Sequence, residues 1–419
     1  IKRTTGQHPG GLVVVPQDMD VTDFCPVQHP ADDPNSDIIT THFEYHCMEA
    51  NLLKLDELGH DDPTMIRMME DLSEQMGERV DAQKILLSDP DTMSIFTSPA
   101  VLGLPDDDPI IGKTGTIGIP EFGTPFTRQM LVDTQPKQFD TLIRLSGFSH
   151  GTDVWAGNIR DLIVNGVATV NETVGCRDDI MIYLISVGIA PALAFKTMEA
   201  VRKGKVKKSG EFPGDAEQQM RDKGVPDWYI ESCRKIAYLF PKAHAVAYVM
   251  MAFRIAWFKV HKPLAFYSAY FYRRSQKGGF DAAMMTGGTD DVRRRINDMR
   301  RRTDLTANQE DLLVTLEAVY EFNMRGFEFA PIDLYESDAT KFMLADEKRL
   351  RPPFVAISGL GESAALDLAH IKESGKRYIS VEELSRDCPK VSQTHLEQLK
   401  ALGALGDMPE SSQINLFEL

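Results

Sequence analysis

Residues 52–62 read LLKLDELGHDD and place Lys54 and Asp56 two positions apart, directly after an apolar run. Side chains of an extended strand alternate between its two faces, so a strand here would present Lys54 and Asp56 on the same face. A strand that shows lysine and aspartate together is unusual in a hydrophobic core. It is common where a metal ion and a phosphate group are held side by side, so this stretch favours a strand in a functional site.

The composition is that of a globular protein. The 419 residues are 42% hydrophobic and 26% charged, which is ordinary for a folded chain and enough for two to four domains. There is no run of about 18 apolar residues and no signal peptide, so we expect no transmembrane helix. The first residues, IKRTTGQHPGG, read as the middle of a domain, and we expect a piece of a longer protein.

The cysteines and two short motifs exclude several site types. The five cysteines are scattered without a CxxC pair, which predicts neither a zinc ribbon nor a disulfide framework and fits a reducing cytosol. His42 and His46 form an HxxxH pair in a β-like stretch, a weak zinc signal without HExxH. The GKT at residues 112–114 is no P-loop, because Asp107 stands where that motif needs a glycine.

Charge is distributed unevenly along the chain. The net charge is -16, and residues 1–70 hold 13 acidic and 4 basic residues. Residues 196–208 hold 6 basic residues and 1 acidic residue, and residues 271–302 hold 9 basic and 4 acidic residues, ending in RRRINDMRRR. Such a pattern suits a protein that binds divalent metal in one place and phosphates in others. The plainer alternative is an acidic surface that keeps the protein in solution.

Periodicity divides the chain into three regions. Residues 1–60 read as strands, in GGLVVVP, IITTHFEYH and NLLKLDELG. Residues 63–275 read as mostly helical, and the long apolar helix AHAVAYVMMAFRIAWFKVHKP stops at Pro263. Residues 276–419 begin with a glycine-rich break and continue with short helices and a few strands. The fold class is therefore α+β with several domains.

Two glycine turns near the C-terminus resemble helix-hairpin-helix motifs. ISGLGESAA places Gly359 and Gly361 between two predicted helices, and LKALGALGDMP holds a weaker copy with Gly403 and Gly406. Glycines permit the tight turn and let backbone N–H groups approach a phosphate, a contact that grips DNA without reading its sequence. The alternative is an ordinary turn between helices with a glycine cap.

The last residues, QINLFEL, carry an apolar pair on a predicted flexible tail. Gln413, Leu416 and Phe417 resemble the Q-x-x-L-F peptide with which bacterial replication proteins bind the sliding clamp. An apolar Leu–Phe pair outside any core usually binds in a groove on a partner protein.

A set of longer motifs carries a family resemblance. TTGQHPGGLVVVP, TTHFEYH, NLLKLDELGHDDPT, TGTIGIPEFGT, SGFSHGTDVW, GCRDDIMIYLI, FPKAHAVAYVMMAFRIAWFKVH and RGFEFAPIDLY together resemble the C-terminal part of the PolC-type alpha subunit of bacterial DNA polymerase III. The resemblance implies four regions. These are the end of a polymerase-β-like palm (1–62), largely helical fingers (63–275), a duplex-binding region with helix-hairpin-helix motifs (276–410), and a clamp-binding tail (411–419).

The resemblance also implies the catalytic chemistry. Asp56 corresponds to one of three palm aspartates that hold two Mg²⁺ ions, which prefer carboxylate oxygens. Lys54 would neutralise charge on the triphosphate or the primer phosphate. The other two aspartates of the family come from an Asp-x-Asp strand upstream that this sequence does not show, and Asp18 and Asp20 have the spacing but not the position. The isolated chain is therefore expected to be inactive.

Further residues are assigned to the nucleotide and the DNA by resemblance. Arg202 and Lys203 would meet the triphosphate, Arg177, Ser149 and His150 would border the nucleotide pocket, and Lys242, His244 and Tyr248 would lie near the template or incoming base. His8 would lie near the active site, with a structural role as its alternative. The arginine strip, defined as Arg293, Arg294, Arg295, Arg300, Arg301 and Arg302, would contact the DNA backbone.

The implied function is DNA-templated DNA synthesis in bacterial chromosome replication. The implied partners are primer-template DNA, dNTPs, the sliding clamp and other replisome subunits, in the cytoplasm and with no membrane. Two alternatives stay open from the sequence. One is the DnaE-type alpha subunit, the sister branch. The other is a non-catalytic module that binds DNA and the clamp, because Asp56 alone cannot assemble a two-metal site.

Overall fold

The computed structural model describes residue 7 and residues 10–57 and 59–411, apart from the side chains of Asp32, His46 and Asp56. The chain divides into two compact units, residues 1–61 and residues 62–419. Each unit is described below by itself.

The first unit is built on a two-stranded antiparallel ribbon. Strand β1 (Gly11–Val14) pairs with β4 (Leu53–Asp56), so that Leu12 faces Leu55 and Val13 faces Lys54. The expected strand at Leu53–Asp56 is therefore confirmed. A small core of Cys25, Met48 and Leu52, with Val13 and Phe24 packed against it, lies beside the ribbon.

The strand expected at IITTHFEYH is mostly wrong. Only β3 (Thr40–Thr41) is extended there, paired with β2 (Val27–Gln28). The chain then turns into a 3₁₀ helix, Tyr45–Cys47, and two more such helices, Val21–Asp23 and Pro30–Asp32, occur among the residues described in this unit. That turn carries Met48 into the small core, and the Tyr45 hydroxyl donates to the Leu52 carbonyl at 3.0 Å. Burial of Met48 thus overrides the local β propensity.

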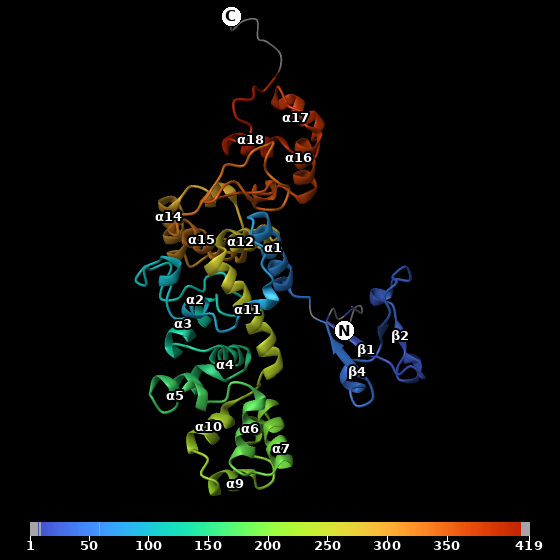
Figure 1. Ribbon diagram of the computed structural model, residues 1–419. Helices are drawn as coiled ribbons and strands as arrows, with labels where there is room; N and C mark the ends of the chain where they lie inside the picture. The colour runs from blue at the N-terminus through green and yellow to red at the C-terminus, as the bar shows by residue number, and fades with distance from the viewer. Residues whose placement is uncertain (1–6, 8–9, 58, 412–419) are drawn as a thin grey trace, which may run out of the picture. The chain divides into compact units, whose positions relative to one another are not determined.

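The second unit is mostly helical, as expected (Figure 1). Prolines at the first helical turn, where a missing N–H costs nothing, begin four of these helices, α2, α3, α7 and α12. The helices up to the long central one are α1 (Asp61–Gln75), α2 (Pro90–Ser94), α3 (Pro125–Thr134), α4 (Phe139–His150), α5 (Arg160–Val164), α6 (Arg177–Ser186), α7 (Pro191–Arg202), α8 (Lys205–Ser209), α9 (Ala216–Asp222), α10 (Asp227–Lys235) and α11 (Lys242–His261).

The rest of the unit continues with shorter helices and one small sheet. The helices are α12 (Pro263–Ser275), α13 (Ala282–Met285), α14 (Thr289–Arg300), α15 (Ala307–Met324), α16 (Glu362–Ser374), α17 (Val381–Asp387) and α18 (Gln393–Ala401). The sheet has the order β5-β7-β6, with β5 (Glu328–Phe329) parallel to β7 (Arg349–Arg351) and β6 (Met343–Leu344) antiparallel to it.

Helix α11 is the central element of this unit. It packs against α2, α4 and α12 and buries residues along its whole length, including Phe253 and Phe258. By length and composition α11 could cross a membrane, although His244, Arg254 and Lys259 interrupt its apolar residues. Its packing on three neighbouring helices accounts for the apolar composition.

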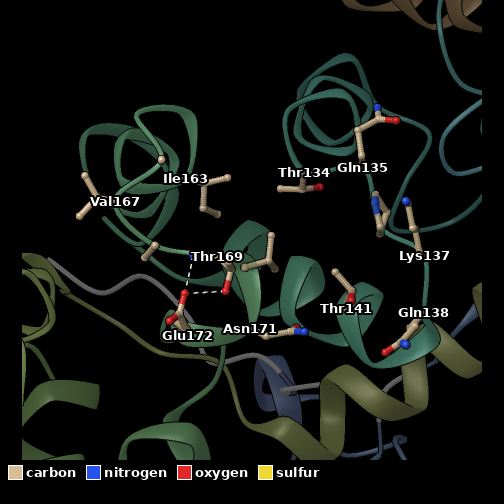
Figure 2. A pocket seen from close by; sticks show the side chains of 14 residues that line it. Thr134, Gln135, Lys137, Gln138, Thr141, Ile163, Val167, Thr169, Asn171 and Glu172 are labelled. Carbon is tan, nitrogen blue, oxygen red and sulfur yellow. Dashed lines mark hydrogen bonds between the residues drawn. The ribbon is translucent and has the colours of Figure 1, made fainter.

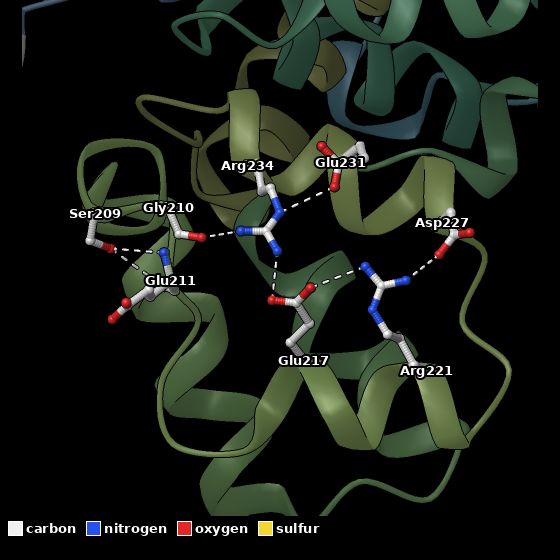
Figure 3. A network of polar contacts seen from close by, with 8 residues as sticks. All are labelled: Ser209, Gly210, Glu211, Glu217, Arg221, Asp227, Glu231 and Arg234. Carbon is white, nitrogen blue, oxygen red and sulfur yellow. Dashed lines mark hydrogen bonds and ion pairs between the residues drawn. The ribbon is translucent and has the colours of Figure 1, made fainter.

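A network of ion pairs ties α9 and α10 together (Figure 3). Glu217 on α9 pairs with Arg221 at 3.1 Å and with Arg234 on α10 at 2.5 Å, and Arg221 also pairs with Asp227 at 2.5 Å. Arg234 donates to the Gly210 carbonyl as well. Arg221 and Arg234 thus link α9 to α10, and the charges of both arginines are paired within the protein.

The glycine turns near the C-terminus differ in detail from the expected hairpins. Only a 3₁₀ turn, Phe354–Ala356, precedes Gly359, where a helix was expected. After Gly406 no further helix follows among the residues that are described. Pro352 and Pro353, which lack backbone N–H groups, shorten the first element.

Candidate functional site

The extended segment 236–241, IAYLFP, is where several elements of the second unit meet. Thr152, just after α4, pairs with it through three backbone hydrogen bonds. Its N–H donates to the Tyr238 carbonyl at 3.0 Å, and its carbonyl accepts from the N–H groups of Ala237 at 3.0 Å and Tyr238 at 3.3 Å. The Leu239 N–H donates to the Arg202 carbonyl at the end of α7 (3.4 Å), and the Arg177 N–H at the start of α6 donates to the Phe240 carbonyl (3.2 Å). Helix α11 begins directly after the segment.

The predicted residues His150, His244 and Tyr248 gather around Phe240 of this segment. The His150 ring stacks on Phe240 with centroids 4.6 Å apart and an interplanar angle of 24°. Tyr248 lies parallel to Phe240 at 6.1 Å, and His244 meets it edge-on at 6.0 Å. The structure therefore brings these three residues together, although 94 positions of sequence separate His150 from His244.

Glu121, which the sequence analysis missed, contacts His150 from a loop. Its Oε2 lies 2.5 Å from His150 Nε2 and accepts a 3.3 Å hydrogen bond from the Ser146 hydroxyl. The hydrogen bond to Glu121 raises the pKa of His150, while partial burial of the ring opposes that shift. The Ser149 hydroxyl instead donates to the Ser146 carbonyl at 3.0 Å, so it turns back along α4.

The start of α6 holds a second polar cluster, around Asp179. Its Oδ2 accepts from the N–H groups of Gly175 and Cys176 at 3.0 and 2.9 Å and lies 3.3 Å from Arg144 Nη1. Its Oδ1 lies 3.5 Å from Lys242 Nζ. Arg144 and Asp179 were not predicted, although an acid at the third position of a helix, as in GCRDD, is a capping signal.

Lys242 and Arg177 are joined through the neighbouring residue Asp178. The Lys242 N–H donates to Asp178 Oδ2 at 3.0 Å, and Arg177 Nε lies 3.8 Å from the same oxygen. The first turns of α6 and α11 are thus held side by side. The cationic side chains of Arg177 and Lys242 are both about one-third exposed, at 35% and 33%.

Arg202 at the end of α7 is engaged by Glu199 on the same helix. Its Nε and Nη2 donate to the two Glu199 oxygens at 2.7 and 2.8 Å, and Lys203 Nζ lies 3.3 Å from Oε2. These contacts, led by the hydrogen bond from Arg202, lower the pKa of Glu199 to about 2. The bidentate fork of Arg202 is therefore filled in this state, whereas Lys203 is half exposed.

Two cavities lie in this region, and the larger contains none of the predicted residues. It has a volume of about 560 Å³ and lies between the loop at 134–141 and residues 163–172, where Thr169 hydrogen-bonds Glu172 (Figure 2). The smaller cavity, of about 430 Å³, is lined by Arg144, Asp179 and Lys242. The lining of the smaller cavity combines the cations Arg144 and Lys242 with the carboxylates Asp179 and Glu172.

The arginine strip is paired throughout with acidic neighbours. Four of the pairs lie within α14 or at its end, at spacings of three or four residues. One pair joins residues two positions apart just after α14, and one reaches Glu317 on α15. The pairs are Arg293–Asp290, Arg294–Asp291, Arg295–Asp291, Arg300–Glu317, Arg301–Asp298 and Arg302–Asp304. The high positive charge read from the sequence is thus largely neutralised at the surface.

Three of the four predicted DNA-binding glycines adopt positive φ. Gly359, Gly403 and Gly406 have φ of 80°, 75° and 56°, a backbone region that favours glycine. Gly361 caps α16 with φ of -72°, so its conformation is open to any residue. Both Gly359 and Gly361 line a cavity of about 450 Å³ at the N-terminal end of α16.

In the first unit, Lys54 lies across the ribbon. Its Nζ is 5.2 Å from the centre of the Tyr45 ring, and a Cβ at Gly11 would stand 3.0 Å from its Cδ. Gly11 therefore leaves room for the lysine stem. The backbone of Asp56 pairs with Gly11, while His8 and the tail residues Gln413, Leu416 and Phe417 lie outside the described residues. No group of three potential metal ligands occurs among the described residues.

Comparison with known proteins shows to which family the chain belongs. Residues 62–224 match the bacterial DNA polymerase III alpha subunit finger domain, residues 1–59 the bacterial DNA polymerase III alpha NTPase domain, and residues 326–413 a helix-hairpin-helix motif. "DNA polymerase III PolC-type" of Caldanaerobacter subterraneus subsp. tengcongensis is 50% identical over 418 residues, which are 100% of this chain and 29% of that protein. The chain belongs to the PolC-type DNA polymerase III family.

Other members of the family agree with this result. The PolC-type polymerase of Bacillus cereus is 50% identical over 418 residues, and that of Staphylococcus saprophyticus is 49% identical over 420 residues, each covering 100% of this chain and 28% of the relative. The chain thus spans less than a third of the length of these relatives. The PolC-type assignment decides against the DnaE-type alternative.

Proposed function

We propose that the chain supplies the end of the palm, the fingers and a duplex-binding region to a DNA-templated DNA polymerase of bacterial chromosome replication. The observation that supports this most is the convergence on segment 236–241 of His150, Arg177, Arg202 and Lys242, which come from four separate helices. All but Lys242 lie within the stretch that matches the finger-domain family. The backbone contacts of Arg177 and Arg202 bring these two cationic positions to the segment that leads into Lys242, which suits a binding site for an anionic ligand.

The chemistry proposed for these residues is electrostatic. Arg177, Lys203 and Lys242 offer partly exposed cations to a triphosphate, and Arg202 adds a bidentate fork once it leaves Glu199. His150, His244 and Tyr248 present rings near which a base can stack. Ser149 contributes less to nucleotide binding, because its hydroxyl already donates to the Ser146 carbonyl. Selection among the four nucleotides would come from template pairing.

The metal chemistry rests on Asp56 and on groups outside the described residues. Mg²⁺, when bound, would activate the primer 3′-hydroxyl and steady the leaving pyrophosphate. The described residues do not complete such a site, and Asp56 would contribute one carboxylate to it. Lys54, extended over Gly11, would place its charge on the same ribbon as Asp56.

DNA contact is proposed at the glycine turns. Gly359, Gly361, Gly403 and Gly406 leave the backbone accessible, and backbone N–H groups bind phosphates without reading sequence. The arginine strip would contribute only after its acidic partners are displaced, so we expect it to add less to DNA affinity than six free cations would. The proposed clamp contact lies in the tail, at Gln413, Leu416 and Phe417.

A non-catalytic DNA- and clamp-binding module remains the second candidate for the isolated chain. The single carboxylate of Asp56 cannot assemble a two-metal site, which favours this candidate for the isolated chain. The ribbon of the first unit also leaves Leu12, Val14, Leu53 and Leu55 exposed on one face, an apolar surface suited to contact with a partner.

A chimeric polymerase tests the proposed function. In it, this chain replaces the matching segment of the Bacillus cereus relative, and primer extension is measured with Mg²⁺ and all four dNTPs. Extension within about tenfold of the unmodified relative would support the proposal. DNA binding without extension, in a chimera that is folded by circular dichroism, would favour the non-catalytic module.

A further inference from the structure

Glu121 stands out because its backbone is strained. It has φ of 67°, one of four positive values among the described residues other than glycine. The left-handed region costs a residue with a side chain roughly 1–2 kcal/mol, and such strain persists where surrounding structure enforces it. Glu121 lies in the loop 117–123, IGIPEFG, where glycine would be the unstrained choice.

The loop that carries Glu121 is fixed from two sides. Phe122 is fully buried and meets Phe96 edge-on with centroids 5.2 Å apart. A Cβ at Gly123 would stand 2.8 Å from the Ile119 carbonyl oxygen, so the turn admits no side chain there. The start of the loop is held by Lys259 of α11, whose Nζ donates to the Ile117 carbonyl at 2.6 Å. The position of the Glu121 carboxylate is therefore set by the core.

The carboxylate is directed at one face of the predicted nucleotide site. Glu121 is only 13% exposed and His150 is 40% exposed, so one partner is shielded and the other reaches solvent. Phe240 covers one side of the His150 ring, and Tyr248 lies 6.3 Å from it. Asp153, the next acidic residue along the chain after His150, forms an ion pair with Lys207 at 2.5 Å, so these two charges balance each other.

We infer that Glu121 is a positioning residue, which holds His150 as an imidazolium against Phe240 so that its charge faces the triphosphate of an incoming nucleotide. This inference rests on the proposed function and adds Glu121 to the residues of the proposed nucleotide site. A carboxylate that stayed unpaired beside a triphosphate would repel it, so pairing with His150 also removes that repulsion. The strained backbone of Glu121 is compensated by the 2.5 Å contact with His150.

The raised pKa of His150 gives the inference a pH signature. Below that pKa the imidazolium carries its charge, and above it the charge is lost. Without Glu121 the pKa of His150 would fall, because the hydrogen bond that raises it is lost while partial burial of the ring still lowers it. His244 and Tyr248 of α11 and Phe240 of segment 236–241 are the other groups around the ring, and none of them supplies a carboxylate.

Glu121→Gly and Glu121→Gln test this with NMR of ¹³C-histidine-labelled full chain. Both variants remove the carboxylate, while glycine also accepts the positive φ, so Glu121→Gly should fold at least as stably as Glu121→Gln. Glu373→Gln is the matched control, because Glu373 contacts His370 at 2.8 Å on the exposed surface of α16. We expect the His150 midpoint to fall in both Glu121 variants and to stay in place in the control.

The same variants in the chimeric polymerase test the link to the nucleotide. We expect the KM for dNTP in the Glu121 variants to rise several-fold at a pH between the variant and wild-type midpoints of His150, with little change at a pH below both midpoints and a smaller change in kcat. An unchanged His150 midpoint would overturn the inference, as would a shifted midpoint with a KM that responds equally at both pH values. A chimera that extends no primer in its wild-type form would instead refute the proposed function, whatever the NMR midpoint shows.

Discussion

Breaking the buried pair of Lys259 and Glu321 from one side should strongly destabilise the second unit. Both side chains are 0% exposed, and Lys259 Nζ lies 2.6 Å from Glu321 Oε1. The same ammonium donates to the carbonyls of Gly115 at 2.8 Å and Ile117 at 2.6 Å, and the Tyr267 hydroxyl donates to Glu321 at 2.6 Å. Burial lowers the pKa of Lys259 to about 8, and Glu321 opposes that shift. The lysine is therefore largely charged at neutral pH.

Lys259→Met removes the cation and leaves the other groups in place. Glu321 would then be a buried carboxylate whose Oε2 already has no hydrogen-bond partner among the described residues. Breaking a buried ion pair from one side costs about 3–5 kcal/mol. The two carbonyls that lose their donor belong to the loop region before Glu121. We expect the variant to lose about 3–5 kcal/mol of unfolding free energy and to loosen that loop.

Urea unfolding followed by tryptophan fluorescence measures this loss. The three tryptophans, Trp155, Trp228 and Trp257, all lie in the second unit, so fluorescence reports its unfolding. With a slope of about 3 kcal/mol per M, the midpoint should fall by about 1 M or more. Lys84→Met, at a lysine whose side chain is 83% exposed, is the control and should leave the midpoint in place.

The double variant Lys259→Met/Glu321→Leu separates pairing from packing. Replacing both charges removes the unpaired carboxylate, so the double variant should be more stable than Lys259→Met alone. A Lys259→Met midpoint within about 0.3 M of wild type, where the predicted loss divided by the slope is about 1 M, would refute this reasoning. So would a double variant that is destabilised by the sum of the two single changes.

Three further predictions follow from the candidate site. Gly204→Ala should destabilise the junction of α7 with segment 236–241, because a Cβ there would stand 2.6 Å from the Ala237 carbonyl oxygen, whereas Gly210→Ala, with nothing within 4 Å, should cost only about 1–2 kcal/mol of strain in urea unfolding. Glu199→Gln should release Arg202 and lower the KM for dNTP in the chimera; an unchanged or higher KM would argue against a triphosphate contact. Removal of residues 412–419 should abolish binding to a bacterial sliding clamp in surface plasmon resonance while leaving DNA affinity unchanged, and retained clamp binding would refute the tail assignment.

The sequence was most informative where a single local signal dominated. Prolines and apolar periodicity predicted the helix that begins at Lys242, and the alternation in LLKLDEL predicted strand β4. The strand expected around Phe43 failed, because the small core needs Met48 and the chain turns to deliver it. Local propensity could not show this, since the deciding contacts lie between segments.

The charged residues show the same limit more sharply. The arginines of α14 read as a basic strip, but the acids three or four residues away pair with them on the helix surface. Glu121 gave no signal as a functional residue, because 29 positions separate it from His150 and only the folded loop brings them together. Spacing along a helix could have exposed the first error, whereas the second needed the tertiary structure.

The central proposal is that the chain serves a DNA polymerase in which Asp56 is a metal ligand, and one measurement tests it most directly. Single-nucleotide incorporation by the chimera is followed in rapid quench with Mg²⁺, for wild type, Asp56→Asn and the exposed control Asp18→Asn. Loss of outer-shell partners of a metal site typically costs about 10–100-fold, so Asp56→Asn should slow incorporation by more than that with duplex binding retained, and Asp18→Asn should be normal. Near-normal incorporation by Asp56→Asn would contradict the claim and leave β4 with a structural role only.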